Sequence, residues 1–102
     1  MEYNKLVRDK IPEIIKSKGI IPITHIASQE EYEEKLKEKL SEEVNEYLKD
    51  SNIEELADIL DVIYALSLIH GIEKNELEEV RSKKTEERGG FIDRIILDET
   101  SD

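Results

Sequence analysis

The sequence contains no cysteine, and this absence removes three kinds of site at once. Without a thiol there is no disulfide bond, no thiolate ligand for a metal and no cysteine nucleophile. Long apolar runs are also missing, because no stretch approaches the roughly 20 apolar residues that a transmembrane helix needs. The first ten residues carry charges throughout and do not resemble a signal peptide. We therefore expect a cytoplasmic protein with no membrane partner.

Basic residues are too few to balance the acidic ones. The chain has 26 Asp and Glu residues against 15 Lys and Arg residues, which gives a formal net charge of −11. Such a chain repels a phosphate backbone, so a nucleic-acid polymer is not expected as a partner. The acidity itself has two interpretations, which are plain solubility and carboxylates that bind a divalent cation. The positions of the carboxylates decide between them.

Glycine and proline are also scarce, and those present mark the ends of helices. Pro12 and Gly19 fit the first turn and the end of a short helix over about 10–18. Ser28 and Glu31 have the spacing of a capping box. From there an amphipathic pattern continues to Asp50 without glycine or proline, which predicts a long helix.

Two further helices are predicted, over about 53–70 and 73–88, and glycines follow each of them. The β-branched segments 20–26 and 91–97 are predicted as short strands or as extended connections. Residues 1–102 therefore form one predicted domain of the mainly α class. We expect an antiparallel helical bundle with short extended N- and C-terminal segments.

The helix predicted over 53–70 is apolar around most of its circumference. Its apolar residues are Ile53, Leu56, Ile59, Leu60, Val62, Ile63, Leu66 and Ile69. A helix of this kind is normally buried, and a chain of 102 residues has few other helices to cover it. We predict a homodimer, with a tetramer as a further state. The alternative is that the first helix and the C-terminal tail cover this helix within one chain.

Carboxylates occur inside or at the edge of the apolar faces of the two long helices. Glu43 falls inside the apolar stripe of the first long helix, and Glu46 lies at its edge. Glu55 and Asp58 lie among the apolar directions of the second long helix. Residues three apart share a helix face. Because the short turn between the helices makes them antiparallel, the two pairs can face each other.

Ionised carboxylates grouped in this way are unfavourable unless a cation neutralises them. Mg²⁺, or alternatively Mn²⁺, binds oxygen ligands and suits such a group. Simpler interpretations exist for single residues, since Glu55 has capping-box spacing from Asn52 and Glu42 fits a solvated surface position. Two such motifs on adjacent helices favour the metal interpretation.

The same residues resemble a known family, the MazG-like all-α nucleoside triphosphate pyrophosphohydrolases. Its hallmark is E-E-x-x-E followed by E-x-x-D, which stand here at 42–46 and 55–58. The opening YNKLVRDKIPEII and the closing ERGGFIDRIIL also resemble a phosphoribosyl-ATP pyrophosphohydrolase-like subgroup, so the resemblance covers nearly the whole chain. The connection between the motifs is shorter than in many members, which bears on the size of the base pocket.

The resemblance implies Mg²⁺-dependent hydrolysis of a nucleoside triphosphate, often a non-canonical one, between the α and β phosphates. The products would be a nucleoside monophosphate and pyrophosphate. The implied metal ligands are Glu43, Glu46, Glu55 and Asp58. Glu42 and Asp61 are the implied candidates for positioning the attacking water.

An acidic site also needs cations for the rest of the triphosphate. The chain has one basic cluster near its start and another before Gly89-Gly90, and Arg8, Lys83 and Arg88 are the predicted phosphate contacts. Their alternative role is to pair with neighbouring glutamates. There is no P-loop, because the double glycine lacks the Lys-Ser/Thr that would follow it.

Two other functions compete with this prediction. In one, the substrate is phosphoribosyl-ATP. In the other, the chain is a non-catalytic helical module for oligomerisation or partner binding, and its acidic residues only keep it in solution. The inward positions of Glu43, Glu55 and Asp58 favour the enzyme, because a plain module would carry leucine or alanine there.

Overall fold

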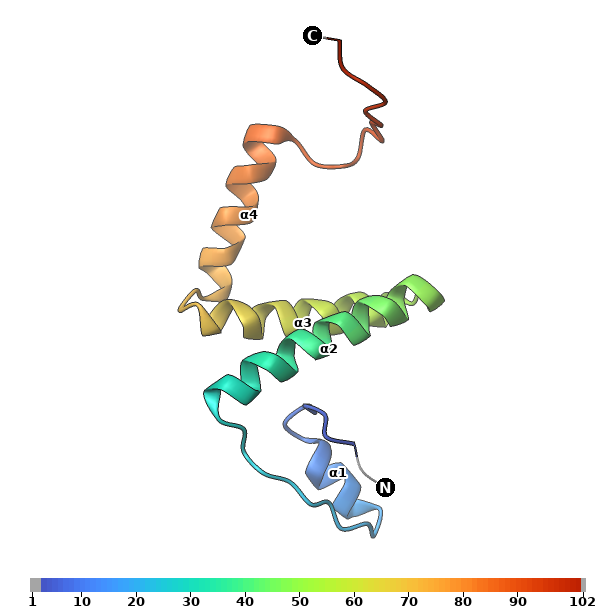
Figure 1. Ribbon diagram of the computed structural model, residues 1–102, viewed down its shortest axis with the longest axis vertical. Coiled ribbons are helices and arrows are strands. Elements are labelled where there is room, and N and C mark those ends of the chain that lie inside the picture. Colours follow the sequence, from blue (N-terminus) through green and yellow to red (C-terminus); the bar gives the residue numbers. More distant parts are fainter. Residues whose placement is uncertain (1–2, 102) are drawn as a thin grey trace.

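The computed structural model describes residues 3–101, and this part of the chain consists of four helices without strands (Figure 1). The helices are α1 (Ile11–Ser17), α2 (Gln29–Asp50), α3 (Ile53–Ile69) and α4 (Lys74–Arg88). Each begins and ends within one residue of the range predicted from the sequence. The mainly α class is therefore confirmed.

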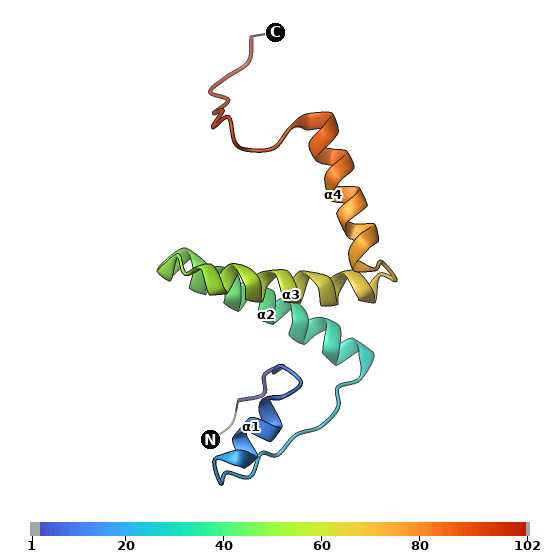
Figure 2. The same cartoon turned by 180° about the vertical axis from the view of Figure 1, so that it is seen from behind.

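α2 and α3 form an antiparallel hairpin, which is the body of the molecule (Figures 1 and 2). Ser28 caps α2 by accepting a hydrogen bond from the backbone N–H of Glu31 at 3.2 Å. At the turn, Ser51 adopts a left-handed conformation with φ 52°, and Asn52 caps α3 by accepting from the N–H of Glu54 at 2.9 Å. The short turn holds the end of α2 beside the start of α3.

The short helix α1 and residues 3–10 before it lie on one side of the hairpin (Figure 1). Pro12 stands in the first turn of α1, and Gly19, with φ 79°, follows its end. Residues 20–27 then lead to α2 without regular secondary structure. Of the two alternatives predicted for 20–26, the extended connection is the one observed.

α4 meets the hairpin at the end of α3 and then extends away from it (Figures 1 and 2). Gly71, with φ 73°, turns the chain, and the Ser67 hydroxyl donates a hydrogen bond to the carbonyl of Ile72 at 2.7 Å. Beyond α4, residues 91–97 form no strand and lie at the far end of the molecule. The tail alternative is therefore the observed one there.

The core of the single chain is small. Among the described residues, Leu36 of α2 and Val62 of α3 are the hydrophobic side chains that are buried, and they face each other inside the hairpin. The radius of gyration is 18.3 Å, against about 13 Å for a compact chain of 100 residues. Within residues 3–101, no helix combines the length and the apolarity needed to cross a membrane. The hairpin positions the candidate site, which lies along one of its sides.

Candidate metal centre

Three carboxylates meet in the groove between α2 and α3. Glu43 comes from α2, and Glu55 and Asp58 come from the first turns of α3. One oxygen from each of them lies within 4.8 Å of the others. The antiparallel hairpin produces this arrangement, because Glu43 stands about two turns before the bend and Glu55 about one turn after it. The structure thus brings together three of the four predicted metal ligands.

Burial makes this group of carboxylates unusual. Glu43 is 6% exposed, although carboxylates are rarely buried without a compensating partner. The Oε2 atom of Glu55 is buried and has no hydrogen-bond partner within the described chain. An unpaired buried polar atom is costly, and for a carboxylate the cost is higher when it is ionised. Glu43 has Lys39 Nζ at 3.3 Å, whereas Glu55 Oε2 lacks a partner that a cation at this position would supply.

The close approach of these carboxylates also changes the pKa of Glu55. Its pKa is raised from 4.5 to about 7, first by the hydrogen bond to Glu43, then by burial and by the neighbouring Glu46. Glu46, the fourth predicted ligand, therefore also lies beside Glu55. Without a cation, the carboxyl of Glu55 therefore holds its proton to a higher pH than an ordinary glutamate does. A carboxyl must lose its proton to bind a metal ion, so a cation bound here would displace the proton of Glu55.

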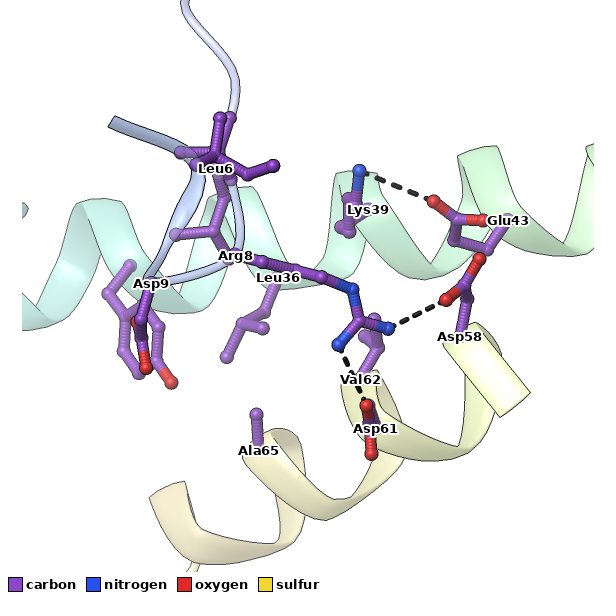
Figure 3. Close-up of a pocket in the computed structure, with 13 residues that line it drawn as sticks. Leu6, Arg8, Asp9, Leu36, Lys39, Glu43, Asp58, Asp61, Val62 and Ala65 are labelled. Atoms are coloured by element: carbon purple, nitrogen blue, oxygen red, sulfur yellow. Dashed lines mark hydrogen bonds and ion pairs between the residues drawn. The ribbon is translucent and has the colours of Figure 1, made fainter. Parts of the chain in front are cut away.

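Basic residues cover the outer side of the carboxylate group (Figure 3). Arg8 spans two residues of α3, with Nη2 2.6 Å from Asp58 Oδ1 and Nη1 2.8 Å from Asp61 Oδ2. Lys39 lies 3.3 Å from Glu43 Oε1. The two carboxylates that Arg8 holds raise the pKa of its guanidinium, so it stays charged. Arg8 thus neutralises part of the site in this structure.

Glu42 lies beside this group and has its own partner. Lys5 Nζ donates to Glu42 Oε1 at 2.9 Å, and this hydrogen bond raises the pKa of Lys5. The ion pair joins the N-terminal segment to α2 across 37 residues of sequence. Lys5 and Arg8 together attach residues 5–9 to the side of the hairpin that carries the carboxylates.

A pocket of about 570 Å³ lies between the N-terminal segment and the hairpin. Its charged end is formed by Arg8, Lys39, Glu43, Asp58 and Asp61. The rest of the lining is apolar apart from Asp9 and is formed by Leu6, Val7, Ile11, Tyr32, Leu36, Val62 and Ala65. The pocket therefore offers a charged end and an apolar surface to one ligand.

Two predicted phosphate contacts lie elsewhere. Lys83 and Arg88 are exposed on α4, which meets the hairpin at the far end of α3 and not at the carboxylates. Within one chain the structure does not bring them to the site, and their role stays a prediction. The capping-box interpretation of Glu55 is not realised, because Asn52 caps the N–H of Glu54 instead.

Two residues of the site were not selected from the sequence. Lys39 is four residues before Glu43 on the same helix, so ordinary i,i+4 spacing was a usable signal for this pair. Lys5 belongs to the basic cluster near the start of the chain. Nothing in the local sequence pairs it with Glu42.

No protein-family model matches the chain, and no curated protein or solved structure matches it. The resemblance of its two motifs to a pyrophosphohydrolase family therefore stays a prediction. The function has to be argued from the geometry of the carboxylates, the basic residues and the pocket.

The raised pKa of Glu55 predicts that the metal-free protein loses stability as the pH rises. Between about 4.5 and 7 the folded state holds a proton that the unfolded chain has released, so each step upward in pH favours unfolding. We expect the melting temperature in EDTA to fall from pH 5 to pH 7.5 and then to level off. The measurement is thermal unfolding followed by circular dichroism.

The matched control for this prediction is Glu55→Gln, which keeps the shape of the side chain and removes the titration. The melting temperature of this variant should depend less on pH over the same interval, since the two histidines and all other groups are present in both proteins. Equal pH profiles for the two proteins would contradict the assignment.

Proposed function

We propose that this chain is a Mg²⁺-dependent hydrolase that cleaves a nucleoside triphosphate between the α and β phosphates. The observation that supports this most directly is the convergence of Glu43, Glu55 and Asp58, with the buried Oε2 of Glu55 lacking a partner. A buried carboxylate oxygen without a donor is stabilised when a cation takes the place of the donor. The all-α pyrophosphohydrolase type of bundle and a cytoplasmic location belong to the same proposal.

The donor set fits Mg²⁺ or Mn²⁺ in chemical type and nearly in spacing. All donors are carboxylate oxygens, the ligands that hard divalent cations prefer. An ion with oxygens at 2.0–2.1 Å holds its ligands no more than about 4.2 Å apart, and the three oxygens here lie within 4.8 Å. Small side-chain rotations of Glu43, Glu55 and Asp58 would close this difference, with Glu46 as a fourth ligand.

The two parts of the pocket suit the two parts of a nucleotide. The apolar part, which includes the ring of Tyr32, suits a base or sugar, because aromatic and aliphatic side chains line most small-molecule sites. The carboxylates at the charged end lie within the same pocket, as Figure 3 shows for Glu43 and Asp58. A nucleoside triphosphate spanning the pocket would therefore place its phosphates at the proposed metal site.

In the proposed reaction, the oxygen of water bonds to the α phosphorus while the bond between that phosphorus and the oxygen bridging to the β phosphate breaks. Pyrophosphate leaves with the electron pair, and Asp61 or Glu42 accepts the proton of the water. A bound Mg²⁺ would supply charge neutralisation to the phosphate oxygens. Arg8 has the planar fork that binds phosphate in two places, so it is the first cation available to the triphosphate.

The test is a panel of canonical and non-canonical nucleoside triphosphates, together with phosphoribosyl-ATP, incubated with Mg²⁺. We expect at least one triphosphate to give monophosphate and pyrophosphate in equal amounts, and EDTA to stop the reaction. Release of single phosphate would exclude cleavage between the α and β phosphates. Exclusive cleavage of phosphoribosyl-ATP would establish that alternative, and no cleavage of any substrate would favour the non-catalytic module.

A further inference from the structure

The N-terminal arm, residues 3–28, packs little against the hairpin. No Cα atom of α1 lies within 8 Å of a Cα atom in α2, α3 or α4. The connection from α1 to α2 is uncovered as well, since Ile21, Ile23 and Ile26 are 87%, 98% and 96% exposed. The attachment of the arm to the hairpin therefore depends largely on the side chains of residues 3–10.

Residues 3–10 carry positive charge and place it on the acidic site. Three basic residues and one acidic residue leave two net positive charges in this segment, within a chain whose net charge is −11. Two of its side chains form ion pairs at 2.6–2.9 Å with three carboxylates of the site, Lys5 with Glu42 and Arg8 with Asp58 and Asp61. We call residues 3–10 the basic strap.

The basic strap supplies the site with a counter-ion from the chain itself. The pKa of Lys5 is raised first by its hydrogen bond to Glu42 and also by the charges of Glu46 and Glu43, so its ammonium lies near two proposed metal ligands. Arg8 pairs with a third proposed ligand, Asp58. The strap thus brings two positive charges to the carboxylates that a divalent cation would neutralise.

The strap is also a wall of the pocket. Leu6 and Val7 line the pocket opposite residues of the hairpin, and the guanidinium of Arg8 lies at its charged end (Figure 3). A turn joins this wall to α1, because the carbonyl of Arg8 accepts a hydrogen bond from the N–H of Ile11 at 3.0 Å. Release of Lys5 and Arg8 from the carboxylates would therefore draw back the wall and open the charged end.

We propose that the basic strap closes the metal-free site and is released when Mg²⁺ binds. This inference rests on the metal site of the proposed function. The strap and the ion neutralise the same carboxylates, so each lowers the affinity of the site for the other by the same factor. Exposed ion pairs are individually weak, so the strap can leave without disturbing the helices. The released Arg8 is then available to the phosphates of the incoming nucleotide.

The first experiment measures how accessible the strap is. The chain has no cysteine, so Leu6→Cys places a single thiol at a half-buried position of the strap. Its rate of modification by iodoacetamide, an uncharged reagent, is compared in EDTA and in Mg²⁺ at equal ionic strength. We expect Mg²⁺ to raise the rate at least about threefold, because three exposed ion pairs that each shift an equilibrium by about 1.4- to fivefold combine to this factor or more.

Two control variants separate release of the strap from direct effects of the ion on the thiol. Ile23→Cys carries its thiol on the exposed connection after α1 and should react at the same rate with and without Mg²⁺. Adding Lys5→Ala and Arg8→Ala to Leu6→Cys should give the fast rate already in EDTA and remove the effect of Mg²⁺. Lys5 and Arg8 are exposed, so this triple variant should keep its helical circular dichroism.

The natural sequence gives a second measurement that does not depend on Leu6→Cys. Trypsin cleaves after lysine, so cleavage after Lys5 reports release of the strap, and cleavage after Lys84 on α4 is the internal reference. Mg²⁺ should raise the ratio of the first rate to the second by at least about threefold.

Calorimetry with Mg²⁺ separates failure of this inference from failure of the proposed function. If Mg²⁺ binds but changes neither the modification of the strap nor its cleavage, the strap does not compete with the ion and the metal site still stands. An effect of Mg²⁺ that persists in the triple variant also overturns the inference, because the ion then acts on the thiol directly. If Mg²⁺ does not bind, the inference and the proposed metal site are both wrong.

Discussion

Glu43→Gln and Asp58→Asn are each expected to abolish triphosphate cleavage while leaving the helices intact. Both replacements keep the size of the side chain and exchange one carboxylate oxygen for an amide group that cannot bind Mg²⁺. Mutation of a residue that only hydrogen-bonds to a metal ligand typically costs 10- to 100-fold in metal affinity or activity. Loss of a metal ligand itself should therefore lower kcat/KM at least 100-fold. Steady-state kinetics at saturating Mg²⁺ measure the effect.

The stability of the metal-free variants separates function from structure. Each replacement removes one negative charge from a group in which Glu55 already keeps its proton up to about pH 7. The melting temperature in EDTA should therefore stay equal or rise. Glu54→Gln is the matched control. Glu54 is exposed in the first turn of α3, next to Glu55, so its replacement should leave activity unchanged. Full activity with lower stability in Glu43→Gln would show that Glu43 is structural.

Arg8→Ala is expected to change metal binding and catalysis in opposite directions. Arg8 holds Oδ1 of Asp58, whose carboxylate we assign to the metal, so removing its charge should strengthen Mg²⁺ binding by about 1.4- to fivefold, as expected for exposed ion pairs. The same change removes the nearest phosphate-binding fork. Hydrogen bonds to charged groups contribute about 1.5–3 kcal/mol, so kcat/KM should fall by roughly ten- to a hundredfold.

The two effects are measured separately, by calorimetry with Mg²⁺ alone and by substrate kinetics. Arg81→Ala is the control, because Arg81 also pairs through two of its nitrogens, in this case with the single carboxylate of Glu78 on α4, away from the pocket. It should change neither quantity. If Arg8→Ala weakens Mg²⁺ binding and cleavage together, Arg8 supports the ligand geometry and does not compete with the ion.

The helices of this protein follow almost entirely from local sequence. Ser28 and Asn52 cap their helices in the structure as the sequence predicts, and Gly19 and Gly71 follow the helix ends with positive φ. These signals are local, because a cap or a glycine acts within one turn of the chain. The arrangement of α1 and α4 around the hairpin depends on distant contacts, and the periodicity of the helices does not determine it.

The candidate site also has a part that local sequence predicts, the carboxylates, and a part that it does not predict, Arg8. Helix geometry and a short turn were sufficient to predict that Glu43, Glu55 and Asp58 converge. The position of Arg8 was not predictable in this way, since its partners lie 50 and 53 residues further along the chain. An arginine suits a carboxylate as well as a phosphate, so its residue type alone does not distinguish the two roles.

The distribution of side chains around α3 also affects how this protein can change over evolutionary time. Its carboxylates Glu55 and Asp58 and its exposed apolar residues Ile53, Leu56 and Leu60 occupy different sides of one helix. Effects at positions without shared partners are approximately additive. Under the proposed function, substitutions among the carboxylates of this 17-residue helix would therefore alter ligand binding and leave its exposed apolar side unchanged.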